Sequence, residues 1–352
     1  MDNNKKIAVG FAYSGKNIGG VRRYIENIEI LSHHDVTLYP SNESDREWRK
    51  KFNFNVRKDM YPVMKANTQK IIDNNDVFHS NVDPSFIKIC EEAQKQGKRW
   101  IHTYHNIYMP EDEPSGKLME WQEEINDIQF RIGGKADTCL CVGEWLVAEC
   151  TKRKIKSIFV PNFIDISKLD NVVKGNFKTK YNFNNFILFA GDNSVRKNCK
   201  ECILAAQLLP QYQFVLMGTG LTKQEIEQAH KIKVPPNVIT MGPLQHEECL
   251  EAMCDCNMLV MNSFTEGLPT VLIETMYYEK PCIIPDGPAW SKHLLTDDSQ
   301  GYKYPIDDFN NLSQTILKLM LDYKTLPNAK KYVEENFSSD VIIKKLDELY
   351  LL

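Results

Sequence analysis

The sequence lacks the features of a membrane-spanning, secreted or disordered chain. No apolar run approaches the roughly 20 residues that cross a bilayer. The start, MDNNKK followed by IAV, lacks the long apolar core of a signal peptide. Hydrophobic residues make up 42% and charged residues 26%, which is typical of a globular chain rather than a disordered or low-complexity one. We therefore expect a cytoplasmic globular protein.

The sequence also has little net charge and no concentrated cysteine framework. Its 43 basic and 47 acidic residues give a formal net charge of −4, which disfavours a globally basic binder of nucleic acid or anionic membranes. The ten cysteines are spread over 352 residues, and several, such as Cys90, Cys139 and Cys282, lie in apolar segments. This distribution favours free buried thiols over disulfides.

What the sequence does contain is a repeated alternation of short apolar runs with segments of helical period. At roughly 150 residues per domain, the length favours two domains. The alternation predicts parallel sheets wrapped by helices. Predicted strands cover residues 7–13, 35–39, 76–80, 99–104, 138–142, 157–160, 186–190, 214–217, 238–241, 258–261 and 281–284. Predicted helices cover residues 21–31, 63–74, 85–96, 117–132, 144–150, 198–209, 246–254, 270–279, 311–323 and 338–352.

A polar stretch over residues 167–185, rich in Asn and Lys and without periodicity, separates the two halves. We therefore predict an α/β fold with two Rossmann-like domains, over residues 1–166 and 167–335. A final helix within 336–352 is expected to pack back on the first domain. Two such domains facing each other would bring the carboxyl ends of both sheets to one central cleft, where ligands bind in these folds.

The most informative motif is FTEGLPTVLIE, residues 264–274. It follows a buried strand and opens a helix, with Thr270 as the expected N-cap and Pro269 fixing the turn before it. Backbone N–H groups at such a helix start can hold a phosphate. Glu266 and Glu274 flank this end, where carboxylates can accept hydrogen bonds from sugar hydroxyls.

This stretch resembles the Glu-x7-Glu motif of the retaining nucleotide-sugar glycosyltransferases of glycosyltransferase family 4, which have the two-domain GT-B fold. The resemblance implies that Glu266 contacts the donor sugar and Glu274 the nucleotide ribose. The same resemblance implies donor binding by Gly267, Leu268, Pro269, Thr270 and Val271. A Glu pair of this spacing can also be incidental at the start of a helix. The order of strand, loop and helix around this pair favours a donor-binding site instead.

A second match lies where the strand 186–190 ends. The family places a Gly-Arg there and a Lys several residues later, to neutralise the diphosphate leaving group. Gly191 and Lys197 fit this pattern, whereas Asp192 stands where the family usually has Arg. Arg196 is the expected substitute, because cleavage of a sugar–diphosphate bond without a metal needs cations where negative charge develops. A solvated basic turn is the alternative.

Glycines complete the predicted donor site. Gly19 and Gly20 match the family's glycine loop, where the absence of Cβ lets the backbone approach the donor phosphate or the acceptor. An ordinary turn is the alternative for this pair. Gly218, Gly242 and Pro243 lie in strand-end turns that resemble those approaching the nucleotide.

His105 is the predicted catalytic contribution of the first domain. The family carries a His at this strand end, near the donor sugar, so the resemblance implies that His105 acts with Glu266 and Lys197. A structural His is one alternative, and a zinc pair with His102 is another. Because residues three apart on a strand point to opposite faces, the zinc pair is disfavoured.

Two other patterns have alternative explanations. The CKEC segment at 199–202 has redox-motif spacing, but two cysteines of an ordinary helix explain it better. The set His246, Cys249, Cys254 and Cys256 fits no usual zinc spacing, and most of it falls on one predicted amphipathic helix. We predict no metal site.

The stretch 46–65 is locally basic, with a net charge of +5 and interleaved aromatic residues. Such a stretch suits an anionic acceptor, whether a membrane surface, a lipid diphosphate or nucleic acid. A solvated loop with a few core aromatics is the alternative. An anionic acceptor at residues 46–65 is compatible with a cytoplasmic protein that contacts a membrane peripherally.

The sequence thus predicts a retaining glycosyltransferase that moves a sugar from a nucleoside diphosphate sugar to an acceptor hydroxyl on a glycan, a lipid-linked molecule or another acceptor. No cofactor or metal is expected to be obligatory, since no Asp-x-Asp triplet is present. Two alternatives remain. One is a sugar-nucleotide epimerase or phosphorylase on the same scaffold. The other, suggested by Asp192, is a non-catalytic protein that binds a nucleotide sugar or a glycan.

Overall fold

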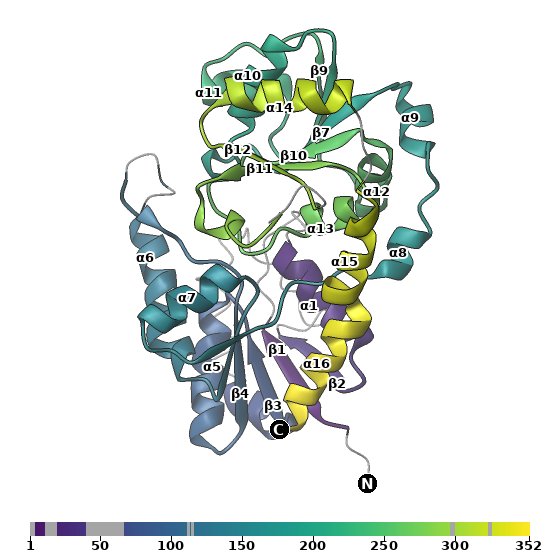
Figure 1. The fold of residues 1–352 in the computed structure, drawn as a ribbon. Helices are drawn as coiled ribbons and strands as arrows, with labels where there is room; N and C mark the ends of the chain where they lie inside the picture. Colours follow the sequence, from purple (N-terminus) through teal and green to yellow (C-terminus); the bar gives the residue numbers. More distant parts are fainter. Residues whose placement is uncertain are drawn as a thin grey trace. The chain divides into compact units, whose positions relative to one another are not determined.

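The computed structural model describes residues 4–10, 20–39, 67–110, 113, 116–295, 300–322 and 326–352 (Figure 1). Gly19 and the basic stretch 46–65 lie outside the described residues. The chain divides into two compact units. The first contains Met1–Pro110, Lys117–Phe163 and Ser339–Leu352, and the second contains Glu111–Gly116 and Ile164–Ser338.

The first unit is built on a six-stranded, wholly parallel sheet in the order β2-β1-β3-β4-β5-β6. Its strands are β1 Lys6–Gly10, β2 Asp35–Tyr39, β3 Val77–Ser80, β4 Arg99–Tyr104, β5 Thr138–Cys141 and β6 Ser157–Phe159. The central strands β1, β3 and β4 are buried over nearly their whole length because helices cover both faces. In β1, Ile7 and Val9 face one core, whereas Ala8 between them faces the other.

Helices on the two faces of this sheet enclose the two cores. They are α1 Gly20–Leu31, α4 Thr68–Asn74, α5 Pro84–Lys95, α6 Glu120–Asp127, α7 Glu144–Lys152 and α16 Ser339–Leu351. Tyr24 and Ile28 of α1 pack with Leu346 of α16, and these two helices lie side by side (Figure 1). Ile72 of α4 and Phe86 of α5 belong to the opposite core.

The helix predicted over residues 117–132 begins later and changes form. The Gln122 side chain accepts a hydrogen bond from the Met119 backbone N–H at 2.8 Å, which caps the helix so that α6 starts at Glu120. After Asp127 the chain continues as a π-helical turn over Ile128–Ile132.

The C-terminal helix α16 makes polar contacts with the rest of the first unit. The Asp347 carboxylate accepts from the Ser32 hydroxyl at 2.6 Å and from the His33 backbone N–H at 3.0 Å. The Tyr350 hydroxyl lies 2.7 Å from His79 Nδ1 on β3. Hydrogen bonds and apolar packing therefore both hold α16 in this unit.

The second unit contains another six-stranded parallel sheet, in the order β12-β11-β10-β7-β8-β9. Its strands are β7 Phe186–Ala190, β8 Gln213–Met217, β9 Val238–Gly242, β10 Met258–Val260, β11 Cys282–Asp286 and β12 Tyr302–Pro305. Strand β12 was not predicted from the sequence. In this edge strand Lys303 and Pro305 interrupt the apolar pattern, and an edge position tolerates both residues.

Eight helices are described in the second unit. They are α8 Ile166–Asp170, α9 Asn176–Tyr181, α10 Cys199–Leu208, α11 Lys223–His230, α12 His246–Asp255, α13 Thr270–Tyr277, α14 Phe309–Leu321 and α15 Pro327–Phe337. The polar stretch 167–185 was expected to have no regular element, yet it contains most of α8 and all of α9. Asp255 anchors α9 by accepting from the backbone N–H groups of Gly175 at 2.6 Å and Lys178 at 3.1 Å.

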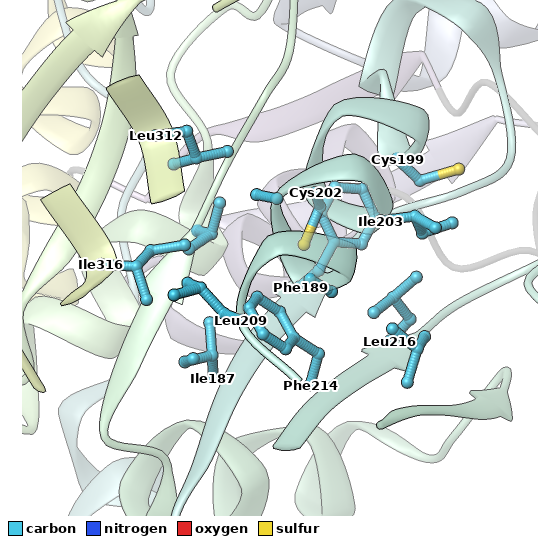
Figure 2. Packing of buried hydrophobic residues seen from close by; sticks show 14 of the residues in the cluster. Ile187, Phe189, Cys199, Cys202, Ile203, Leu209, Phe214, Leu216, Leu312 and Ile316 are labelled. Carbon is cyan, nitrogen blue, oxygen red and sulfur yellow. The ribbon is translucent and has the colours of Figure 1, made fainter. Parts of the chain in front are cut away.

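Figure 2 shows the core between the sheet and helices α10 and α14. Cys202 and Ile203 of α10 and Ile316 of α14 pack over Ile187 and Phe214 of the sheet. Burial of an Ile or Phe side chain stabilises a fold by about 1.5–3 kcal/mol. All ten cysteines of the chain are free thiols, so Cys199 and Cys202 are two buried cysteines of one helix.

The topology fixes where each unit can hold a ligand. In the second unit the chain runs from β7 to β8 and β9, then returns to place β10 on the other side of β7. The switch point therefore lies between β7 and β10, and in the first unit it lies between β1 and β3. Crevices at the carboxyl ends of such strands are the usual binding sites of these folds. None of the described helices has both the length and the apolar composition of a membrane span.

Candidate functional site

A carboxylate and two cations meet at the switch point of the second unit. Arg196 and Lys197 lie in a short 3-10 turn after β7, and Glu266 lies in the loop after β10. Lys197 Nζ is 2.5 Å from Glu266 Oε1, and Arg196 Nη1 is 3.2 Å from Glu266 Oε2. The structure thus brings together three residues that the sequence singled out from motifs 69 or 70 positions apart.

The two cations determine the protonation state of Glu266. The residue is only 7% exposed, and burial by itself raises the pKa of a carboxyl group. The positive charges of Lys197 and Arg196 outweigh burial and lower the pKa of Glu266 to about 2. Glu266 is therefore an anion at neutral pH, paired with two cations.

Backbone hydrogen bonds join the basic turn to the Glu266 loop. The Phe264 N–H donates to the Arg196 carbonyl at 2.9 Å. In the other direction, the Arg196 guanidinium donates to the Thr265 carbonyl at 2.8 Å. The separation between the cations and the carboxylate is therefore set by main-chain contacts as well as by the ion pairs.

Glu274 lies on α13 in the same unit and is 2% exposed. Its Oε1 is 2.9 Å from His246 Nε2 at the start of α12. From the sequence, His246 is a candidate zinc ligand only. In the structure His246 is a partner of Glu274. The sequence does not predict this pairing, because the two residues are 28 positions apart and belong to different helices.

The start of α13 corrects one prediction. Thr270 was expected to be the N-cap, but it is the first helical residue, and Pro269 occupies the N-cap position without a side-chain hydrogen bond. The extended conformation of Pro269, with ψ of 116°, ends the loop one residue earlier. Of the neighbouring predicted donor residues, Leu268 is buried, whereas Gly267 and Val271 are half-buried.

Three predicted glycines lie at the ends of adjacent strands. The Gly191 N–H donates to the Met217 carbonyl at 3.1 Å, and the Gly218 N–H donates to the Gly242 carbonyl at 2.7 Å. Gly218 has a φ of +139°, and a Cβ there would lie 1.5 Å from the Gly191 oxygen. Pro243 follows this group and is exposed.

We predict that Gly218→Ala lowers the free energy of unfolding by about 3 kcal/mol, because it combines a disfavoured backbone conformation with a backbone clash. Gly175→Ala is the matched control: its φ is +96°, but no atom lies within 4 Å of its added Cβ. Urea unfolding of both variants measures the difference. Equal losses in the two variants would contradict the close approach at Gly218.

Asp192, the residue where the resemblance leads one to expect Arg, has a local structural role. Its Oδ1 accepts from the Ser194 backbone N–H at 2.9 Å, which shapes the turn that leads to Arg196. Such Asx turns are a common use of Asp in loops. The guanidinium beside Glu266 therefore comes from Arg196, four residues further along the chain.

In the first unit, His105 follows β4 and is 4% exposed. Its Nε2 is 2.8 Å from Asn81 Oδ1, and Asn81 Nδ2 donates to the Gly10 carbonyl at 3.2 Å. Since the amide nitrogen of Asn81 faces Gly10, its oxygen faces His105, so Nε2 carries the hydrogen. Burial lowers the pKa of His105 to about 3, and the imidazole is neutral at pH 7.

Asn81 was not identified from the sequence, although it links the ends of β1 and β4 beside the switch point of the first unit. A single Asn after a strand gives no distinctive signal. His102 has different surroundings from His105, with Ser80 Oγ 2.8 Å from its Nδ1 and the Tyr104 ring 4.5 Å away. Gly20 is the exposed first residue of α1.

Across the part of the chain that the structure describes, no three His, Cys, Asp or Glu side chains converge in a way that would hold a metal ion. The predicted independence of a metal stays a prediction, as do the individual roles of the site residues.

Comparison with known proteins shows a family match over most of the second unit. Residues 174–336 match the family model for "Glycosyl transferases group 1". This segment contains the basic turn, the Glu266 loop and α13, which together form the candidate site of the second unit.

Curated relatives align over part of their length. One is a Campylobacter jejuni GalNAc-alpha-(1->4)-GalNAc-alpha-(1->3)-diNAcBac-PP-undecaprenol alpha-1,4-N-acetyl-D-galactosaminyltransferase. It is 30% identical over 172 residues, which cover 47% of this chain and 44% of the relative. Bacillus subtilis EpsF is 23% identical over 227 residues, covering 59% and 56% of the two chains. The chain spans about half the length of the curated relatives it matches.

Solved structures share the fold over nearly the whole chain. Anabaena HepE in complex with UDP and glucose has a TM-score of 0.76 and 15% identity, over 98% of this chain and 99% of HepE. Sucrose-phosphate synthase from Thermosynechococcus elongatus has a TM-score of 0.75 and 16% identity, over 99% and 98%. The predicted fold class is thereby confirmed, and the resemblance to the glycosyl transferases group 1 family is confirmed over residues 174–336.

Proposed function

We propose that this chain is a retaining glycosyltransferase that moves a sugar from a UDP-sugar to an acceptor hydroxyl without an obligatory metal. The observation that carries the proposal is the ionised Glu266, held between Lys197 and Arg196 at a switch point of the sheet. The family match of residues 174–336 supports it. HepE was solved with UDP and glucose, and the Campylobacter relative is an N-acetylgalactosaminyltransferase, which supports a uridine diphosphate donor.

The proposed reaction breaks the bond between the anomeric carbon and the diphosphate oxygen. The electron pair leaves with the diphosphate, and Lys197 and Arg196 stabilise the charge that develops there. The acceptor oxygen forms its new bond on the face that the leaving group vacates, and the acceptor proton passes to the departing diphosphate. Glu266 contacts the donor sugar and stabilises its positive character, and Glu274 binds the ribose.

The first unit is proposed to complete the site through Gly19, Gly20 and His105. A neutral His105 suits the role of orienting the sugar rather than donating a proton, since its Nε2 hydrogen is engaged by Asn81. We propose a glycan acceptor carried on a lipid diphosphate. The basic stretch 46–65 would supply its anion contact, and the name of the Campylobacter relative supports this acceptor class.

The test is a panel of nucleotide sugars, starting with UDP-glucose, UDP-galactose and their N-acetylated forms, with GDP-mannose for comparison. A donor at 100 times its Kd should stabilise the fold by about 2.7 kcal/mol and raise Tm. Release of UDP that depends on an acceptor supports a transferase. Conversion of the donor alone favours an epimerase, and binding without turnover favours a non-catalytic protein. Absence of stabilisation by every nucleotide sugar would refute the proposal.

We predict that Glu274→Ala raises the Kd for the UDP-sugar about 10- to 100-fold. The substitution removes the hydrogen bonds that the ribose hydroxyls donate to the Glu274 carboxylate, which are worth about 1.5–3 kcal/mol. At saturating donor, kcat should stay within about twofold. Titration calorimetry and initial rates measure the two quantities. Glu247→Ala, at an exposed residue beside His246, is the control. An unchanged Kd in Glu274→Ala would remove Glu274 from the donor site.

A further inference from the structure

A buried hydrogen-bond chain lies beside the basic turn and the Glu266 loop. Asn262 Nδ2 donates to the Tyr304 hydroxyl at 2.6 Å, and this hydroxyl donates to Glu201 Oε2 at 2.8 Å. Asn198 Nδ2 donates to the same Glu201 oxygen at 2.9 Å. All four side chains are at most 8% exposed. We name this set, Asn198, Glu201, Tyr304 and Asn262, the buried brace.

The two ends of the buried brace adjoin the candidate site. Asn198 directly follows Lys197 and has a left-handed φ of 48°, so its orientation determines how the basic turn enters α10. Asn262 is the second residue after β10, the strand that leads into the Glu266 loop. Glu201 and Tyr304 connect these ends, from α10 and from the edge strand β12.

Side-chain packing alone does not fix the turn and the loop. Val195 of the basic turn and Phe264 of the Glu266 loop both line a cavity of about 610 Å³, which Asn198 and Glu201 also border. Where a cavity replaces packed atoms, the lining side chains lose the dispersion contacts that restrain them. Directional hydrogen bonds in a buried, low-dielectric setting are then a further restraint, besides the ion pairs of Glu266 and the direct bonds between the turn and the loop.

We propose that Glu201 and Tyr304 are positioning residues, whose hydrogen bonds keep the basic turn at a fixed separation from the Glu266 loop. Neither residue is placed in contact with the donor. They act through Asn198 and Asn262, and through the bond from the Phe264 N–H to the Arg196 carbonyl. The kinetic consequence rests on the proposed function, whereas the structural consequence does not.

The direction of the bonds shows which variants are informative. Tyr304 and Asn198 both donate to the Glu201 carboxylate, and Asn262 donates to Tyr304, so Glu201 must accept. Glu201→Gln keeps an acceptor oxygen of similar shape, whereas Glu201→Leu removes it. Tyr304→Phe removes the central hydroxyl and both of its bonds. Burial raises the pKa of Glu201 to about 7, so the measurements belong at pH 8, where the carboxylate is ionised.

The first measurement is amide hydrogen exchange, which needs no substrate. In Tyr304→Phe and Glu201→Leu, the Phe264 N–H should exchange about tenfold faster, while the Leu216 N–H in the centre of β8 stays within twofold. Glu201→Gln should restore the protection of Phe264. Unchanged protection at Phe264 would overturn the proposal, because Glu201 and Tyr304 would then not hold the Glu266 loop. An equal loss of protection at Leu216 would also overturn it, because the two residues would then contribute only to general stability.

The second measurement is donor turnover. Tyr304→Phe and Glu201→Leu should lower kcat about tenfold with KM within twofold, and Glu201→Gln should keep wild-type kcat within about twofold. Tyr212→Phe, which packs on the same core at the amino end of β8, is the control. Faster exchange at Phe264 with wild-type kcat would overturn the positioning role.

The two proposals fail in different ways. If the wild type transfers no sugar from any donor, the proposed function is wrong. The exchange experiment still decides whether the buried brace holds the basic turn and the Glu266 loop together. If the wild type is active and Phe264 keeps its protection in both disrupting variants, only the positioning role is wrong.

Discussion

Replacing Glu266 by Gln should lower sugar transfer at saturating donor by about 10²–10³-fold, the size expected for loss of one preorganised electrostatic contact. Gln keeps the volume of the side chain but removes the charge that faces the positive character of the sugar. The substitution also removes the anion between Lys197 and Arg196. Since those cations are left to bind the diphosphate, KM for the donor should change much less than kcat.

The measurement is kcat and KM with the donor that the nucleotide-sugar panel identifies. Glu335→Gln is the control, because Glu335 is a 61% exposed side chain on α15 whose ion pair with Lys331 spans 3.8 Å. Wild-type turnover in Glu266→Gln would remove Glu266 from the proposed mechanism, while an equal loss in the control would point to a general effect of charge.

Lys197→Met should lower kcat by about 10²-fold or more and also destabilise the folded chain by about 3 kcal/mol at pH 7. Both effects have one cause: Lys197 is 2.5 Å from a buried carboxylate that keeps its charge in the folded state. Met fills a similar volume but brings no cation. Urea unfolding and donor turnover measure the two losses separately.

The double variant Lys197→Met with Glu266→Gln separates stability from chemistry. Without the buried charge, the missing cation costs little, so most of the lost stability should return while turnover stays low. A double variant that remains as unstable as Lys197→Met would show that the ion pair is not what holds this region. Recovery of turnover in the double variant would contradict the catalytic assignment of both residues.

The same ion pairs predict how stability depends on pH. The pKa of Glu266, about 2, lies below the ordinary value of 4.5, which corresponds to about 3 kcal/mol of stability at neutral pH. This contribution is fully present above about pH 4.5 and is lost as the pH falls toward 2. Glu266→Gln should therefore flatten the stability curve between pH 5 and 2 in urea titrations. A curve parallel to that of the wild type would contradict the lowered pKa.

Much of the fold follows from local patterns that need no knowledge of tertiary contacts. Strands such as β7 and β8 are continuous apolar runs because both of their faces are covered, and such runs are easy to recognise. Elements that depend on distant partners were harder to find. The short helix α9 needs Asp255, some 80 residues away, and the edge strand β12 is interrupted by Lys303 and Pro305.

The residues of the candidate site differ in the same way in how far the sequence predicts them. Glu266, Glu274 and Lys197 were identified because their motifs have a fixed order around a strand, a loop and a helix. Asn81, Glu201 and Tyr304 were not, because each acts through a partner that is distant in sequence. The hydrogen bond between Glu201 and Tyr304, for example, joins residues 103 positions apart.

The alternation of short apolar runs with segments of helical period determined by itself that this chain forms two α/β halves, and the order of the motifs placed a candidate site in the second. The lack of long apolar runs and the balanced charge only excluded other classes of protein. Such patterns depend on neighbours within about one turn or strand, which the sequence records directly. Only the tertiary structure decided that Arg196 stands beside Glu266 while Asp192 shapes the turn, and that His246 pairs with Glu274. The Arg196–Glu266 pairing depends on which strand ends become adjacent in the sheet, and the His246–Glu274 pairing depends on how α12 packs against α13. Both are properties of the folded topology.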